Sequence, residues 1–157
     1  MFMATLILVL STAMFFFYLQ GVCQKILRRQ FAESFWQAIA QANGFEFPSI
    51  REALKNSGAV PYQSLRSGLQ RDFQTLTYLA KNAANVSQRH TREERFLIGY
   101  FKFMAFSMVV RHALKLGEKP AALRMTAILQ YFANVVGERA NSVRFGNLTA
   151  ADYLLNL

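Results

Sequence analysis

The amino-acid sequence predicts an all-α protein, with an N-terminal single transmembrane helix followed by a compact five- to six-helix bundle. The run from Met1 to Val22 carries no acidic or basic side chain, and about 20 apolar residues are enough for a helix to cross the hydrocarbon core of a bilayer. Beyond this run, apolar residues recur at steps of three and four, as they do on helices that lie against a core. Sustained two-residue alternation, the pattern of a half-buried strand, is nearly absent.

The opening segment, residues 1–24, is interpreted as a retained transmembrane anchor. A cleavable signal peptide is one alternative, but no Lys or Arg precedes the apolar run, and the residues around Gly21 make a poor cleavage site. A lipoprotein signal is a second alternative because Cys23 follows the run, although the residues just before it are bulky or polar where small ones are needed. A buried N-terminal core helix is the third alternative.

The charges that flank the run predict its orientation. Lys25, Arg28 and Arg29 follow the apolar residues, whereas only the α-amino group precedes them. Positively charged flanks stay on the cytoplasmic side of a membrane. We therefore expect a single-pass protein of the cell inner membrane, with its N-terminus outside and its C-terminal domain in the cytoplasm.

Residues 25–47 predict a juxtamembrane helix that combines basic and aromatic residues, and Asn43-Gly44 predicts its end. Basic side chains in this position bind anionic lipid headgroups, with about 1 kcal/mol from each Lys or Arg near the surface. The aromatic side chains are expected either to lie in the membrane interface or to dock on the following domain, and an ordinary topology-setting flank explains the bases equally well. The candidate membrane-interface residues are Lys25, Arg28, Arg29, Phe31, Phe35 and Trp36.

Residues 48–157 predict an α-helical cytoplasmic domain that begins with two amphipathic helices. Ser49 is expected to be the N-cap of the first helix, with Glu52 at the capping-box position. The second helix follows Pro61 and repeats apolar residues at steps of four and three until a polar stretch at 82–87, which predicts a loop.

A strongly apolar helix is expected over residues 92–116. Thr91 opens it with a capping box, and Gly117 is expected to end it as the C′ residue. The apolar stretch 96–110 within it suggests a second membrane span as an alternative. It is short and contains Lys102, however, which favours a buried central helix.

A second strongly apolar helix is expected over residues 120–137. Pro120 suits its first turn, where proline is tolerated, and Gly137 marks its expected end. A last short helix is expected over 149–155. The two apolar helices, wrapped by the amphipathic ones, would form the core of the bundle.

The composition and the titratable residues argue against a catalytic role. The chain has 18 Lys and Arg against 9 Asp and Glu, a net charge of +9, which favours anionic partners; the bases are scattered, which argues against nucleic acid. Cys23 is the only cysteine, so no intramolecular disulfide or cysteine-based metal cluster forms. His90 and His112 are not spaced as metal ligands. No catalytic, cofactor-binding or metal residue is expected, and no cofactor.

These observations favour a non-enzymatic structural or accessory subunit of a larger membrane protein complex, of the secretion, conjugation or respiratory type. Its expected partners are the membrane, the other subunits of the complex and anionic lipid headgroups. A membrane-tethered adaptor that binds an acidic protein or nucleic acid through a basic surface is an alternative. A small lipid-handling membrane enzyme is a second alternative, with Lys102 and Arg124 on the two apolar helices binding an anionic lipid group.

Overall fold

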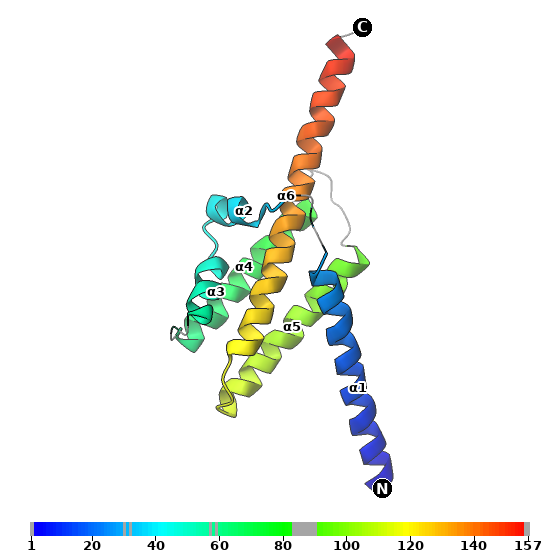
Figure 1. The fold of residues 1–157 in the computed structure, drawn as a ribbon, viewed down its shortest axis with the longest axis vertical. Coiled ribbons are helices and arrows are strands. Elements are labelled where there is room, and N and C mark those ends of the chain that lie inside the picture. Colours follow the sequence, from blue (N-terminus) through cyan, green and yellow to red (C-terminus); the bar gives the residue numbers. More distant parts are fainter. Residues whose placement is uncertain are drawn as a thin grey trace.

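The computed structural model describes residues 2–29, 31, 33–56, 58, 60–82 and 91–155, with side chains described up to residue 142. The described residues form helices and no strand, which confirms the predicted all-α fold with a long apolar helix ahead of a helical bundle. The helices of this part of the chain are α1 (Phe2–Leu27), α2 (Trp36–Asn43), α3 (Phe47–Lys55), α4 (Tyr62–Asn82), α5 (Arg92–Ala113) and α6 (Lys119–Leu155), as shown in Figure 1.

Helix α6 is the centre of the bundle. It contacts each of the other helices described, and from Ala121 to Gly137 most of its side chains are buried, with Ile128 and Phe132 fully enclosed. A helix that is apolar around its whole girth is stable only when other elements enclose it. Pro120 lies in the first turn, as predicted.

Helix α6 does not end at Gly137. It continues to Leu155, so the predicted separate helix over 149–155 is wrong. Gly137 lies inside the helix and is buried where Phe35 packs on it, and a Cβ atom at position 137 would lie 2.1 Å from the Cβ of Phe35. The glycine is therefore explained by a close approach between distant parts of the chain and not by a helix terminus.

The N-terminus of α3 is capped from another helix. Ser49 lies within the first turn, where its hydroxyl donates a hydrogen bond to the carbonyl of Glu46 at 2.8 Å, so the predicted capping box is wrong. The Oδ2 atom of Asp72, on α4, accepts hydrogen bonds from the backbone N–H groups of Glu46 and Phe47, both at 2.8 Å. The carboxyl group thus satisfies amides that a helix start leaves without partners. Its burial raises the pKa of Asp72.

Helix α5 begins as predicted but ends early. The side-chain oxygen of Thr91 accepts a hydrogen bond from the N–H of Glu94 at 3.3 Å, which confirms the N-cap. The helix ends at Ala113, and Lys115, with φ 55°, takes the left-handed position that was predicted for Gly117. The backbone N–H groups that follow bond to carbonyls of the last turn, so a Schellman motif forms without glycine at C′.

Residues 25–47 do not form one helix: they contain the end of α1, the whole of α2 and the first residue of α3. Helix α1 runs on to Leu27, and the described residues between there and Phe35 are not helical. Helix α2 ends at Asn43, and Gly44 follows with φ 62°, which confirms the predicted stop. Residues 83–90, which contain most of the predicted loop and His90, lie outside the described part of the chain.

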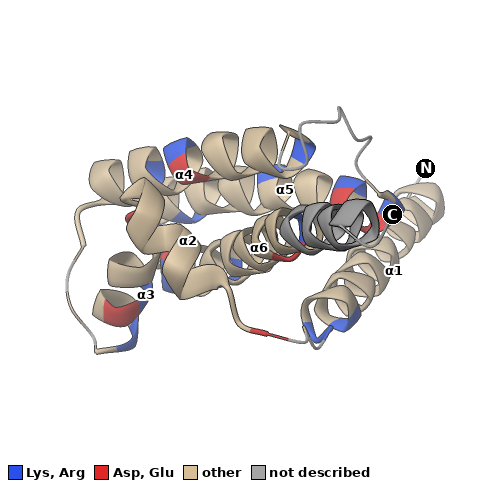
Figure 2. Cartoon of the chain, turned by 90° about the horizontal axis from the view of Figure 1, so that it is seen from above, with Lys and Arg blue, Asp and Glu red and all other residues tan. Residues whose placement is uncertain are grey.

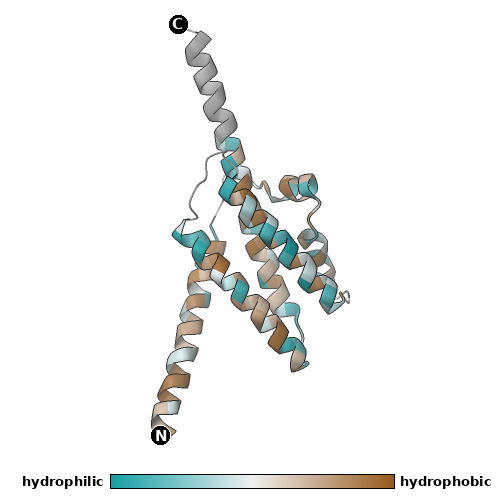
Figure 3. Cartoon of the chain, turned by 180° about the vertical axis from the view of Figure 1, so that it is seen from behind, coloured by the Kyte–Doolittle hydropathy of each residue, from teal (hydrophilic) through white to brown (hydrophobic). Residues whose placement is uncertain are grey.

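The first and last helices leave the bundle in opposite directions (Figure 1). The N-terminal part of α1 projects from one end with a largely hydrophobic surface (Figure 3), and the C-terminal part of α6 extends past the other helices at the opposite end. The second half of α1 belongs to the bundle, since α1 contacts both α5 and α6.

Candidate functional site

Residues 2–18 of α1 form an extended, exposed apolar surface. Every residue from Phe2 to Tyr18 is exposed, and several large side chains, such as Phe17 at 73%, are almost fully so. Helix α1 is the one helix in the described part of the chain that is long and apolar enough to cross a membrane. Exposed apolar surface of this extent marks a membrane or protein contact.

The second half of α1 forms a seam with α5. The rings of Phe16 and Phe103 stack with their centroids 4.7 Å apart and their planes 19° from parallel. Further along α1, Cys23 is fully buried, and Leu19 and Ile26 pack against the core. The same helix is therefore free at its start and part of the core at its end.

The basic candidates at the end of α1 differ in what they contact. Lys25 and Arg28 are exposed. Arg29 approaches two carboxylates of the bundle, Glu93 on α5 at 3.8 Å and Glu138 on α6 at 3.7 Å. Arg29 thus links the segment after α1 to the bundle, although its side chain is still 49% exposed. The side chains of Lys25 and Arg28 are likewise open to a headgroup.

The aromatic candidates dock on α6. The ring of Phe31 meets that of Tyr131 edge-on at 5.4 Å, Phe35 packs over Gly137, and the backbone N–H of Trp36 donates a hydrogen bond to Asn134 at 2.9 Å. Of the two placements expected for these aromatic side chains, the structure has the docked one. These three residues hold the segment between α1 and α2 against α6.

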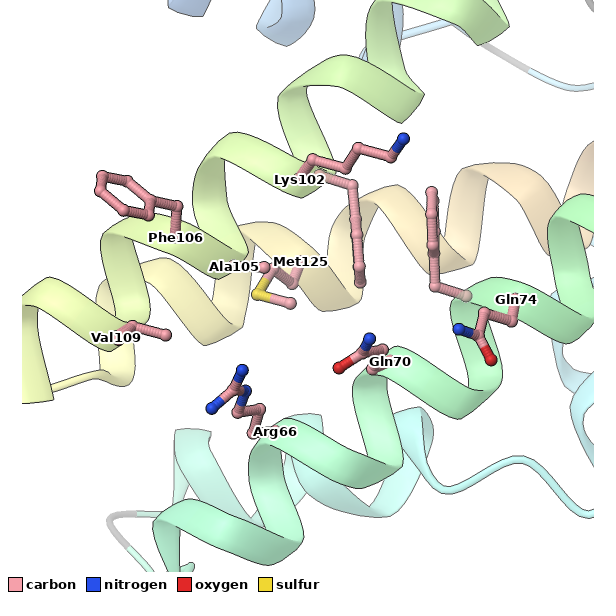
Figure 4. Close-up of a pocket in the computed structure, with 10 residues that line it drawn as sticks. Arg66, Gln70, Gln74, Lys102, Ala105, Phe106, Val109 and Met125 are labelled. Atoms are coloured by element: carbon pink, nitrogen blue, oxygen red, sulfur yellow. The ribbon is translucent and has the colours of Figure 1, made fainter.

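A hollow of about 350 Å³ lies between α4 and α5, over α6 (Figure 4). Its floor includes Phe73 and Phe101, whose rings stack 3.8 Å apart, and Met125 of α6. Arg66 and Lys102 bring positive charge to its edge. An apolar floor with a cationic edge suits an amphiphile that has an anionic head.

The two cations of the predicted lipid-handling site do not converge. Lys102 lines the hollow between α4 and α5, whereas Arg124 lines a separate one of about 280 Å³ beside α1, together with Arg111. Arg124 also donates a hydrogen bond to the hydroxyl of Tyr100 at 3.5 Å. One anionic group therefore does not meet both side chains in this arrangement.

His112 and Glu118 are explained by their contacts with each other and with Tyr62. His112 stacks on Tyr62 with ring centroids 3.8 Å apart and meets Glu118 at 2.5 Å, and this hydrogen bond lowers the pKa of Glu118. Among the described residues no group of three or more His, Cys, Asp or Glu side chains is placed to hold a metal ion. Figure 2 shows Lys and Arg on several helices, interspersed with Asp and Glu.

A buried ion pair joins three helices near the start of α5. Arg139 of α6 donates a hydrogen bond to Glu94 of α5 at 2.6 Å and another to the backbone carbonyl of Ala80 near the end of α4. Both charged side chains are largely enclosed, at 15% and 3% exposure. The sequence places these residues far apart, and no local pattern connects them.

Sequence reasoning also missed that α5 has two different apolar faces. One face is buried against the bundle, and the other carries a stripe of outward residues at steps of three and four: Phe96, Gly99, Phe103, Phe106 and Val110. We call these residues the outward stripe. Its spacing was visible in the sequence, but an almost uninterrupted apolar run obscures which of its two faces is enclosed.

Comparison of the chain with models of protein families, with curated proteins and with solved structures finds no match.

Proposed function

We propose that the protein is a single-pass membrane subunit, anchored by α1, whose helical domain lies on the cytoplasmic side and supports a larger membrane-bound assembly without performing chemistry. The observation that carries the proposal is the uncharged, exposed apolar surface of α1 from Phe2 to Tyr18. Each Å² of such apolar surface costs about 25 cal/mol in water. A bilayer removes this cost over the whole segment.

The order of charges along the chain supports the proposed orientation. Lys25 and Arg28 come directly after the apolar segment and are exposed, and basic residues in that position are held on the cytoplasmic side. The N-terminus then lies outside, and the bundle lies in the cytoplasm.

The projecting end of α6 supports a role in assembly. Its backbone continues as a helix to Leu155, beyond the other helices of the bundle (Figure 1). A helix that extends beyond its own bundle offers a length along which a helix of a neighbouring subunit can pack.

Carbonate extraction and protease protection of the full chain with a C-terminal tag test the anchor and its orientation. We expect the protein to stay with the membrane and the tag to be digested only after the cells are opened. Leu10→Arg, in the middle of the segment, should weaken anchoring because a central Arg costs about 3 kcal/mol on insertion, and Gln24→Arg at its end is the matched control. Release of the parent protein by carbonate would contradict the anchor, and digestion of the tag in intact cells would contradict the orientation.

Affinity purification of the full chain in a mild detergent tests the role as a subunit. We expect other membrane proteins to co-purify in a fixed ratio to the tagged chain. Recovery of the chain as a lone monomer from native membranes would refute the assignment to an assembly while leaving the anchor intact.

A further inference from the structure

Most of the outward stripe of α5 is exposed, and Phe103 is the member that Phe16 of α1 partly covers. Phe96 is 51% exposed, Phe106 is 66% exposed and Val110 is 39% exposed. The opposite face of the same helix is enclosed by the core. The buried residues of that face are Leu97, Tyr100, Phe101, Met104 and Met108.

The uncharged run of α1 continues past the point where α5 joins it. Phe16 stacks on Phe103 of α5, and no charged side chain follows in α1 until Lys25. A basic flank marks the cytoplasmic end of a membrane span. In a membrane-spanning α1 the residues between Phe16 and Lys25 therefore lie towards the cytoplasmic leaflet, and Phe16 lies there beside α5. The part of α5 around Phe103 is then at the depth of the cytoplasmic leaflet.

The charges of α5 fit this placement. Between Lys102 and Arg111 the helix has no charged side chain. Arg95 and Lys102 are exposed, and no carboxylate among the described residues pairs with either of them. Long basic side chains beside an apolar face reach from the acyl region to anionic headgroups.

The turn after α5 has the same amphipathic character. Leu114 and Leu116 are 62% and 65% exposed, and Lys115 lies between them. Exposed leucines interleaved with a base are typical of a segment in the membrane interface.

We propose that the outward stripe of α5 is a second membrane contact, lying against the acyl chains of the cytoplasmic leaflet beside α1, with Arg95 and Lys102 at the headgroups. The proposal rests on the membrane span proposed for α1. Lipid is favoured over a protein partner because the Phe16–Phe103 stack joins the outward stripe directly to the exposed surface of α1. The bundle is thus partly embedded and does not hang from a flexible tether.

Tryptophan quenching by brominated lipid tests this contact in the full-length protein. Trp36, the single tryptophan of the chain, is replaced by Phe, and Phe106→Trp then places the probe on the outward stripe. Phe15→Trp reports on the span, and Tyr78→Trp, at a 68% exposed position on α4, is the control away from the stripe. Each variant is reconstituted in vesicles of phosphatidylcholine and phosphatidylglycerol with or without bromine on the acyl chains.

We expect brominated chains to quench the emission of the Phe15→Trp and Phe106→Trp variants and to leave that of the Tyr78→Trp variant unchanged. Quenching at position 15 with red-shifted, unquenched emission at position 106 would overturn the second contact while the anchor stands. Blue-shifted but unquenched emission at 106 would also overturn it, because a protein surface then covers the stripe. Absence of quenching at both positions would refute the span itself. Far-UV circular dichroism and protection of the Cys23 thiol verify that each variant is folded.

Discussion

Replacing Gly137 by alanine tests whether this glycine is present for packing. In the interior of a helix, Gly→Ala stabilises by about 1 kcal/mol when the new methyl group meets nothing. At position 137 the new Cβ would lie 2.1 Å from the Cβ and 2.5 Å from the Cγ of Phe35. Neither atom is the flexible end of a side chain, so the connection between α1 and α2 has to move.

The contact with Phe35 determines how much Gly137→Ala should change the free energy of unfolding. Overpacking of an enclosed site costs about 1–3 kcal/mol, and displacement of Phe35 also gives up part of the burial of a large aromatic side chain, worth roughly 1–2 kcal/mol. After subtraction of the gain in helix propensity, we expect Gly137→Ala to lower the free energy of unfolding by about 1–3 kcal/mol.

Two other helical glycines provide matched controls. A Cβ at Gly99 on α5 would meet nothing within 4 Å, so Gly99→Ala should stabilise by about 0.5–1 kcal/mol. A Cβ at Gly68 on α4 would lie 2.5 Å from the Oε2 of Glu46, which is the end of a flexible side chain. The Cδ1 of Ile50, also the end of a side chain, would lie 3.3 Å away. Gly68→Ala should therefore destabilise much less than Gly137→Ala, because both side-chain ends can move aside.

Thermal unfolding of the full chain in mild detergent measures all three variants. Cys23 is the only cysteine and is fully buried, so a thiol-reactive dye reports unfolding, and far-UV circular dichroism provides a second signal. Each kcal/mol should shift the midpoint by about 2–4 °C. Phe35→Gly removes the clashing atoms, so Gly137→Ala should cease to destabilise in that background. An equal midpoint shift for Gly137→Ala and Gly99→Ala would refute the packing explanation.

Three further predictions concern the polar contacts of the bundle. Asp72→Ala leaves two amides at the start of α3 without their acceptor. It should lower the free energy of unfolding by about 2–4 kcal/mol in the same thermal assay. Asp72→Asn keeps an oxygen acceptor and should lower it less. Arg139→Leu breaks a buried ion pair and should cost about 3 kcal/mol or more, much of which Glu94→Leu should restore in the double variant by thermal unfolding. The pKa of Glu118 is lowered below its ordinary value of 4.5, so this group stabilises the fold above that pH and ceases to do so as the pH falls through the lowered pKa. Glu118→Gln should flatten that part of the curve of midpoint against pH, and an unchanged curve would contradict the contact with His112.

The features that the sequence predicted well are those with local causes. The N-cap at Thr91 and the stop at Asn43-Gly44 each depend on residues within one turn of the helix end. The length of α1 and the uncharged stretch before Lys25 likewise lie in one continuous run. Such signals act before any tertiary contact forms, and the structure retains them.

The features that the sequence did not predict depend on contacts between distant residues. Asp72 caps a helix that starts 25 residues earlier, and this replaces the local capping box expected at Ser49. Gly137 resembled a helix end because glycine is common there, but the ring that excludes a side chain comes from Phe35. A single sequence contains no spacing that relates either pair.

The contacts of the aromatic candidates Phe31, Phe35 and Trp36 also depend on residues that are distant in the sequence. Phe31, Phe35 and Trp36 beside several bases fit a membrane interface and a docked segment equally well. The contacts that these residues make with Tyr131 and Asn134 come from α6, far along the chain, and no local pattern predicts them. The sequence could therefore name candidate residues but not the contacts that they make.

Two deletions in α1 test separately the exposed start of the helix and the buried end that packs in the bundle. Deletion of residues 2–12 removes only exposed surface, whereas deletion of residues 2–24 also removes Leu19 and Cys23 from the seam. Loss of these buried side chains should cost about 1–3 kcal/mol each, and Tyr100 and Met104, which line the seam, become exposed. We expect the shorter deletion to keep the parent midpoint of thermal unfolding in detergent and the longer one to lower it or to aggregate. Equal midpoints for the two deletions would show that the seam contributes nothing, and the bundle would then be a domain independent of its anchor.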